Sequence, residues 1–392
     1  MAAMLKYEID HQNGGFDAEK VRNSAVTCTE SAVKRTESAK IHFCQPSIQQ
    51  RGVPKCRYLF EPFIVQGTIN LWAGEPGVGK SIIATAVAIH LAALYATDED
   101  GPAGNLLAVD GKNEWCGLPI NKPPGRVLYV TEETEEEIDI RWYRLLNSYD
   151  LNEDQRMQLN GGFFVLTFDE LRRVYKREVA EGIAKEAERY EAGLVVIDTV
   201  GHLIGGNIND YHIISQTYDA LRPILNSGRT LLLLDHVAKR QFGGEDRNQE
   251  ELTPIGSAQK MGQARHVTTI RRVERVKTED PSVERTAVRL EVTKSNRTKD
   301  GQTVDLDIVF DEKAEYQWVE PAPLRGLKEE IFELLQERGE MQRKDIVEEL
   351  GTGKEIAIKR RLAELVEQGI VIRTKRGWYA LKTAGDNREC GK

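Results

Sequence analysis

The sequence predicts an α/β fold with a mostly parallel sheet and antiparallel edge strands, followed by a small C-terminal domain. Three observations predict this architecture. A glycine-rich loop separates a β-prone segment from a helical one at residues 74–81, a wholly apolar run at residues 194–197 ends in an acid, and three helical patterns precede a strand pair after residue 325. A strand that is apolar at every position is typical of a parallel sheet, because both of its faces are buried.

The glycine-rich loop reads Gly74-Glu75-Pro76-Gly77-Val78-Gly79-Lys80-Ser81, which fits the pattern G-x-x-x-x-G-K-S. Its spacing lets successive backbone N–H groups turn inward around nucleotide phosphates. The apolar run that starts at Ile82 predicts a helix, whose N-terminus favours an anion. Residues 74–82 are therefore the predicted contacts to ATP, with Lys80 on the β- and γ-phosphates and the Ser81 hydroxyl on Mg²⁺. The alternative is a glycine-rich turn without a ligand.

Composition limits the class of protein. Forty per cent of the 392 residues are hydrophobic and 30% are charged, which is typical of a soluble protein with a real core. The sequence has no apolar run long enough to span a membrane and no signal-peptide pattern, so we expect a cytoplasmic protein. The five cysteines lack metal-ligand spacing. A net charge of −8 implies that any nucleic acid contacts local patches or a channel formed on assembly.

Changes in composition divide the chain into four parts. Residues 1–54 are polar with little apolar periodicity, which predicts a flexible N-terminal arm. Residues 55–320 form the predicted nucleotide-binding domain, residues 325–384 the C-terminal domain, and residues 385–392 a tail. Inside the first domain, the polar stretch 97–125 is either a lid or interaction surface, or a tolerated loop.

Acidic residues follow two of the predicted strands. Glu132 and Glu133 come directly after the β-prone run 126–131, and Asp198 ends the apolar run. Sheets of this class bind their ligands at the carboxyl ends of strands, where a carboxylate can orient water towards a γ-phosphate. We predict Glu133 as this base, with Glu132 as the substitute, and Asp198 as a holder of the Mg²⁺ water shell. The alternatives are helix capping for the glutamates and turn capping for Asp198.

Later strands carry further polar candidates. His236 ends the strand that starts at Thr230, where it could sense the γ-phosphate or be a structural histidine. Three alternating segments after Ala264 predict antiparallel strands that extend the sheet. Lys294 and Arg297 lie near the end of the second of these, where a solvated turn is the alternative to a functional role.

Together these features resemble the RecA-like P-loop NTPase core of hexameric helicases, an AAA-type ATPase domain. The resemblance is closest to the RepA-like plasmid replicative helicases and more distant to the DnaB, RadA and KaiC groups. It covers roughly residues 55–315 and rests on the residues 74–81 loop, the acid pair after Thr131, the Val195–Asp198 run, Asp235-His236, Gly256-Ser257 with Arg265, and Lys294 with Arg297. One departure is that a single His236 follows Asp235, where family members commonly have tandem histidines.

The resemblance implies roles for these residues. Glu133 would be the catalytic glutamate, and His236 the γ-phosphate sensor. Lys294 and Arg297 would be fingers that reach the nucleotide of a neighbouring subunit. That arrangement implies a homo-oligomeric ring, expected to be a hexamer, with ATP at the interfaces and single-stranded DNA in its channel.

The C-terminal segment resembles a winged helix-turn-helix domain. Its three predicted helices and its hairpin follow the proline-containing linker Glu320–Pro323. The third helix carries Lys354, Lys359, Arg360 and Arg361, which suit the phosphates of a DNA duplex. Protein binding is the alternative, because the first two helices are acidic.

Two classes of function remain open at this point. The first is an ATP-driven DNA helicase or translocase of replication or of a mobile element. The second is an ATP-switched DNA-binding regulator, in which hydrolysis only resets the assembly. A RadA-like recombination or repair ATPase is a further alternative.

Overall fold

The computed structural model describes residues 56–96, 113–149, 151–167, 176–204, 210–237, 257–276, 278 and 280–382. The predicted N-terminal arm, most of the 97–125 insertion and the C-terminal tail lie outside the described residues. Within the described part, Cys56 and Cys116 are free thiols. No helix in these ranges combines the length and apolar character needed to cross a membrane.

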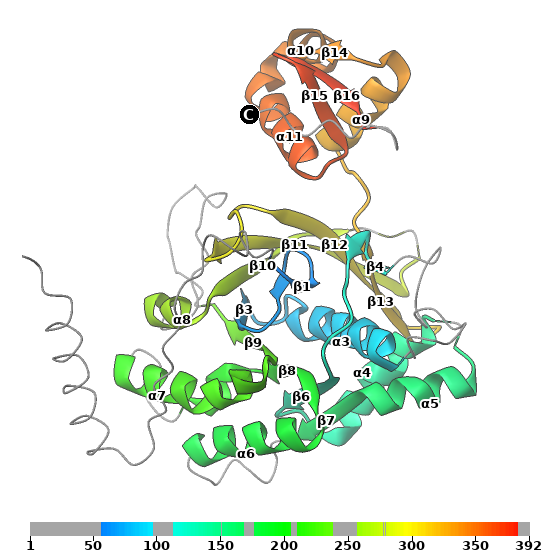
Figure 1. Cartoon of the computed structure of the whole chain (residues 1–392). Coiled ribbons are helices and arrows are strands. Elements are labelled where there is room, and N and C mark those ends of the chain that lie inside the picture. The colour runs from blue at the N-terminus through cyan, green and yellow to red at the C-terminus, as the bar shows by residue number, and fades with distance from the viewer. Residues whose placement is uncertain are drawn as a thin grey trace, which may run out of the picture. The chain divides into compact units, whose positions relative to one another are not determined.

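A nine-stranded sheet forms the centre of the fold, in the order β13-β12-β11-β10-β3-β9-β8-β6-β7 (Figure 1). The six strands from β10 to β7 run parallel, and β11, β12 and β13 are antiparallel to their neighbours. This confirms the predicted sheet with antiparallel edge strands. The strands are β3 (Ile69–Gly74), β6 (Arg126–Thr131), β7 (Phe163–Thr167), β8 (Ala192–Asp198), β9 (Thr230–His236), β10 (His266–Val276), β11 (Val283–Ser295), β12 (Thr303–Asp311) and β13 (Tyr316–Pro321).

Helices cover both faces of this sheet, and alternate strand residues feed two separate cores. On β3, Trp72 packs with α3 (Lys80–Ala96), α4 (Glu135–Asn147) and α5 (Glu153–Gly162), whereas Leu71 packs on the opposite face. That opposite face holds α6 (Lys176–Arg189), η2 (Val200–Leu203), α7 (Tyr211–Leu221), η3 (Arg222–Ser227) and α8 (Ser257–Gln263). Two small hairpins, β1 (Tyr58–Phe60) with β2 (Ile64–Val65) and β4 (Glu114–Trp115) with β5 (Leu118–Pro119), complete this part.

The C-terminal segment has a core of its own. It contains α9 (Leu327–Arg338), β14 (Met341–Gln342), α10 (Arg343–Leu350), η4 (Thr352–Lys354), α11 (Glu355–Glu367), β15 (Val371–Lys375) and β16 (Trp378–Leu381). The strands form a sheet in the order β14-β16-β15. Ile331, Ile358 and Leu362 are fully buried in the core, as the helical spacing of apolar residues requires. The three helices and the hairpin expected from the sequence are all present.

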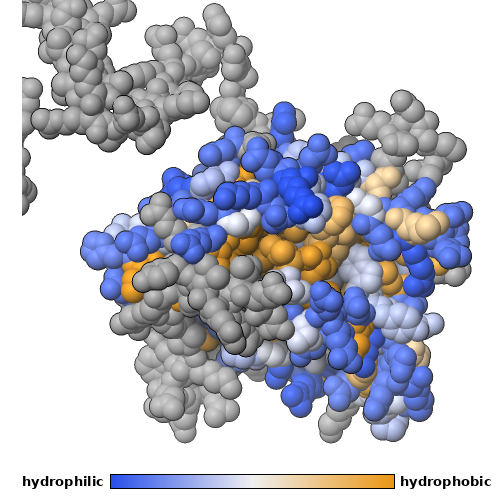
Figure 2. Space-filling model, turned by 90° about the horizontal axis from the view of Figure 1, so that it is seen from below, coloured by the Kyte–Doolittle hydropathy of each residue, from blue (hydrophilic) through white to orange (hydrophobic). Residues whose placement is uncertain are grey.

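Some elements differ from the expectation. Glu320 and Pro321 belong to β13, which pairs with β12, so the linker is shorter than the sequence suggests. Strand β11 extends four residues before and three beyond the alternating segment 287–292, because its outer residues also pair along the neighbouring strands. Figure 2 shows the surface of one face, where an apolar area is framed by hydrophilic side chains.

His90, on α3, gives the fold a predicted pH dependence. Its Nδ1 lies 2.8 Å from the Ala86 carbonyl and its Nε2 lies 3.4 Å from the Tyr149 hydroxyl, a pairing that suits the neutral ring. Burial lowers the pKa of His90 to about 4. Between about pH 4 and 6.5 the unfolded chain therefore binds more protons than the folded chain. The contribution of His90 to stability is fully present above that range and falls as the pH drops through it.

The wild-type protein loses free energy of unfolding between about pH 7 and pH 5, because only neutral His90 fits the core. We expect this loss to be smaller by about 2 kcal/mol in His90→Phe. Urea unfolding at the two pH values measures this loss. His212→Phe, at an exposed position, is the control and should leave the loss unchanged. An equal loss in wild type and His90→Phe would contradict the assignment.

Candidate nucleotide-binding site

The glycine-rich loop joins the end of β3 to the start of α3, as the sequence predicts. Gly77 and Gly79 have φ values of 70° and 99°, in the region that favours glycine. A Cβ at Gly79 would also collide with the Ile308 side chain of β12. Ile82, in the first turn of α3, packs against the core, and the amide of Ile83 donates to the Gly79 carbonyl at 3.0 Å. The loop is therefore tightly held between a strand and a helix N-terminus.

Lys80 lies buried beneath this loop. Its Nζ donates to the carbonyls of Gly74 and Glu75, both at 2.9 Å, and lies 3.2 Å from His236 Nδ1. Burial lowers the pKa of Lys80 to about 8, although Asp198 and Asp235 oppose this effect. Burial and the Lys80 charge also lower the pKa of His236, so its imidazole is neutral and accepts through Nδ1. Among the described residues, the groups within hydrogen-bond distance of this buried ammonium are neutral, which suits it to receive an anion.

The sheet order brings the other predicted residues to the same edge. Strand β9 lies between β3 and β8, and β6 follows β8. In register, Gly74 pairs with His236 and Thr131 pairs with Asp198. The loop, the His236 strand end, Asp198 and the acid pair after Thr131 therefore share one end of four neighbouring parallel strands.

Asp198 is held by the hydroxyl group of Tyr129, on the neighbouring strand β6. Its Oδ2 accepts a 2.8 Å hydrogen bond from the Tyr129 hydroxyl. Burial and the Asp198 charge raise the pKa of Tyr129, so Tyr129 remains a donor. This contact fixes the Asp198 carboxylate relative to β6.

The acidic cluster after β6 divides into two groups. The first turn of α4 holds Glu135, Glu136 and Glu137, and the helix is capped reciprocally by Thr134 and Glu137. Glu133 precedes this cap, and its Oε1 accepts from Arg141. Glu132 instead pairs with His202 of η2, at 2.7 Å. Thr134 and Glu137 therefore cap α4, whereas Glu132 pairs with His202 and Glu133 pairs with Arg141.

Two buried oxygens at this edge have no hydrogen-bond partner within the described residues. They are Glu133 Oε2 and Thr199 Oγ1, and the latter directly follows Asp198. Buried polar atoms are normally satisfied, so such orphans point to a missing ligand or water. A Mg²⁺–nucleotide fits this site, because the Ser81 hydroxyl and the Asp198 carboxylate are the oxygen ligands that Mg²⁺ prefers.

Lys294 and Arg297 lie at the other end of the sheet. Lys294 pairs in register with Val267, near the start of β10, whereas the loop end of β3 pairs with Ile270. The Lys294 Nζ donates to the carbonyls of Met261 and Ala264, at the end of α8. Arg297 is exposed in the turn that follows β11. Neither side chain is near the phosphate loop of its own chain.

Three residues that lie near the site were not predicted from the sequence. Arg141 contacts Glu133, Arg272 of β10 donates to the Gly77 carbonyl at 2.8 Å, and Lys260 of α8 donates to Asp235 at 2.7 Å. Lys260 and Asp235 are both almost fully buried, so the aspartate beside His236 is charge-compensated. Arg272 stands on a strand next to β3, and only that pairing reveals its closeness to the loop.

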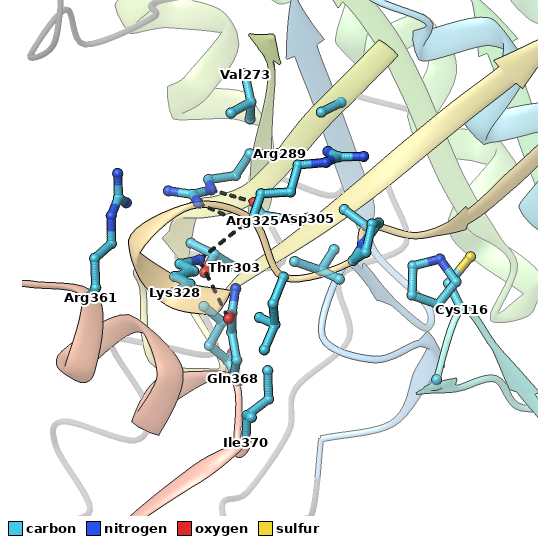
Figure 3. Close-up of a pocket in the computed structure, with 18 of the residues that line it drawn as sticks. Cys116, Val273, Arg289, Thr303, Asp305, Arg325, Lys328, Arg361, Gln368 and Ile370 are labelled. Atoms are coloured by element: carbon cyan, nitrogen blue, oxygen red, sulfur yellow. Dashed lines mark hydrogen bonds and ion pairs between the residues drawn. The ribbon is translucent and has the colours of Figure 1, made fainter. Parts of the chain in front are cut away.

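A separate cavity of about 900 Å³ lies away from the phosphate loop, among residues of β11, β12, α9 and α11 (Figure 3). Asp305 accepts from Arg289 at 2.5 and 2.7 Å and from Lys328 at 3.2 Å. Lys328 also pairs with Glu364 at 3.1 Å. Because acids already neutralise these cations, the cavity is not a candidate anion site.

A comparison with models of known protein families agrees with a nucleotide-binding loop. A family model described as an AAA domain, AAA_25, matches residues 45–241, which is half of the chain. No curated protein sequence matches. The KaiC-like protein PH0186 of the archaeon Pyrococcus horikoshii OT3 is 15% identical, with a TM-score of 0.42 over 68% of this chain and 94% of its own. The RadB recombinase is 12% identical, with a TM-score of 0.40 over 66% and 93%. Such low values carry no inference about activity.

Proposed function

The chain belongs to the AAA domain family, and from this premise we propose that it hydrolyses ATP with Mg²⁺ as an oligomeric DNA helicase or translocase of the RepA-like class. The observation that carries the ATPase proposal is the meeting of Lys80, His236, Asp198 and Glu133 at one edge of the sheet. Phosphoryl transfer needs positioning and charge stabilisation rather than covalent catalysis, and this edge offers both.

Each residue has a defined task in this proposal. The loop amides and Lys80 bind the β- and γ-phosphates, and Lys80 exchanges its carbonyl contacts for phosphate oxygens. Ser81 and Asp198 hold Mg²⁺, which supplies positive charge next to the phosphates. Glu133 accepts a proton from the attacking water, and His236, in contact with Lys80, senses the γ-phosphate.

The positions of Lys294 and Arg297 support an oligomer. Because they lie at the opposite end of the sheet from the loop of their own chain, they can reach a nucleotide only in a neighbouring copy. Head-to-tail contacts of this kind generate rings or filaments. We therefore propose a ring, with six copies as the expected number.

The C-terminal segment supports DNA as the partner. Its α11 exposes Lys359, Arg360 and, at 87%, Ile356, a surface suited to a nucleic-acid groove. At the hairpin tip, Lys375 lies over the Trp378 ring at 3.9 Å. We propose that this segment acts as a winged helix that contacts duplex DNA, while single-stranded DNA occupies the ring channel.

ATP turnover with and without DNA tests the function. We expect single-stranded DNA to stimulate turnover severalfold in a particle of hexameric mass, and a forked duplex to be unwound. Slow turnover that ignores DNA, in a small oligomer, would contradict the motor and favour the ATP-switched regulator. Filaments on single strands would favour a recombination ATPase.

A mixing experiment tests the contact between subunits. We expect Arg297→Ala and Lys80→Ala to be inactive separately but partly active when mixed. In a random mixture, about a quarter of the interfaces join an intact loop to an intact Arg297. Turnover of the 1:1 mixture is compared with that of each variant alone. No recovery in subunits shown to exchange would contradict action in trans.

A further inference from the structure

Glu133 stands on an irregular stretch, between the end of β6 and the cap of α4. Its amide donates to Thr131 Oγ1 at 3.2 Å, and its side chain is 28% exposed. A glutamate has three rotatable bonds, so the backbone alone does not fix the carboxylate. Some other group must set its direction if it is to act on one particular water molecule.

Arg141 supplies the contact that fixes the carboxylate. It donates to Oε1 of Glu133, and its own side chain is only 17% exposed. It stands on α4, which is anchored by the Thr134–Glu137 cap and by the buried Leu145 and Leu146. The guanidinium is thus presented by a helix to a carboxylate on an irregular segment.

The second oxygen of Glu133 is left for another partner. Oε2 is buried and makes no hydrogen bond within the described residues, although Oε1 of the same group is paired. Although burial opposes it, the charges of Glu133 and Asp198 raise the pKa of Arg141, and Asp198 accepts a hydrogen bond from Tyr129. Arg141 is therefore in direct contact with the proposed base and within electrostatic reach of the proposed Mg²⁺ ligand.

We propose that Arg141 is a positioning residue for hydrolysis: it holds Oε1 of Glu133 so that Oε2 is directed to the attacking water. Arg141 touches neither the nucleotide nor the water in this assignment. The inference rests on the ATPase function proposed above, and it assigns the step of that reaction at which Arg141 acts.

The assignment predicts a selective kinetic defect. Without Arg141 the carboxylate samples several directions, while the loop, Lys80 and Asp198 keep their contacts. We expect Arg141→Gln to lower kcat about 10- to 100-fold with little change in nucleotide affinity, because misplacement of a reacting group costs rate more than binding. Arg141→Lys keeps a charge near Oε1 and should recover part of the rate.

Full-length Arg141→Gln, Arg141→Lys, Glu133→Gln and the double variant are compared in single-turnover hydrolysis and in binding of a fluorescent ATP analogue. Arg144→Gln is the matched control, because Arg144 lies one turn further along α4 and stacks on Phe310 at 4.9 Å. If Arg141 acts through Glu133, Arg141→Gln causes little further loss in the Glu133→Gln background. Thermal unfolding confirms that each variant is folded.

Two kinds of result overturn the inference alone. One is a wild-type rate in Arg141→Gln when Glu133→Gln is impaired. The other is a parallel loss of rate and nucleotide affinity in Arg141→Gln, equal losses in both backgrounds, or no rescue by lysine, any of which shows a purely structural role. An absence of turnover in the wild type, or full turnover in Lys80→Ala, instead overturns the proposed function and this inference with it.

Discussion

Replacing Lys80 with alanine is expected to lower ATP turnover by about 100- to 1,000-fold and to weaken nucleotide binding. Lys80 is buried, and Gly74, Glu75 and His236 are its neighbours, so its charge is available to phosphate oxygens. Alanine removes the charge that stabilises the transferred phosphoryl group. The measurements are phosphate release under saturating ATP and titration with a fluorescent ATP analogue.

The control for this variant is Lys313→Ala. Lys313 is exposed and pairs with Asp280 at the surface, so its removal should leave turnover unchanged. Full activity in a folded Lys80→Ala protein would refute the nucleotide site as a whole, because every other assignment at this edge depends on a bound phosphate.

Glu133→Gln is expected to bind ATP normally but to hydrolyse it about 100- to 10,000-fold more slowly. Glutamine keeps the shape of the side chain and an oxygen for Arg141, but it cannot accept a proton from water. Binding and single-turnover hydrolysis are measured on the same preparation, so that an intact site and a slow chemical step are seen together.

Glu132→Gln decides between the two glutamates. Glu132 pairs with His202, which is half exposed, so we expect a much smaller effect on turnover. If Glu132→Gln abolishes hydrolysis and Glu133→Gln does not, Glu132 is the base. The Arg141 contact would then concern only the shape of the turn before α4.

The central strands were predictable because their signals are local. Strands β6, β8 and β9 are apolar runs, and both faces of each are covered by helices. The phosphate loop is likewise local, since glycine spacing and the flanking elements lie within a short segment. For such elements, burial and conformation follow from neighbouring residues.

Other elements depend on contacts that no local pattern encodes. Helix α8 is short and polar, and it is stabilised through the buried Lys260 and its distant partner Asp235. Strand β13 ends in a segment whose prolines suggest a linker, yet it pairs with β12 along its whole length. In both cases tertiary pairing overrides local propensity.

The candidate site, too, was predictable from the sequence only in part. The strand-end positions of Asp198 and His236 follow from the sequence, but their partners do not. Tyr129 contacts Asp198 only because β6 lies beside β8, and His236 meets Lys80 only because β9 lies beside β3. Strand order, which the sequence leaves open, thus determines the electrostatics of the site.

The acidic residues of β12 determine where the chain can be truncated without a loss of stability. Asp307 is fully buried and pairs with Arg285 of β11 and with Arg325, while Asp305 pairs with Arg289 and with Lys328. A chain cut after Pro323 would lose Arg325 and Lys328, leaving each carboxylate with fewer cations. Such a fragment should be less stable and more prone to aggregate than its own core suggests, so the nucleotide-binding part is best studied with α9 attached.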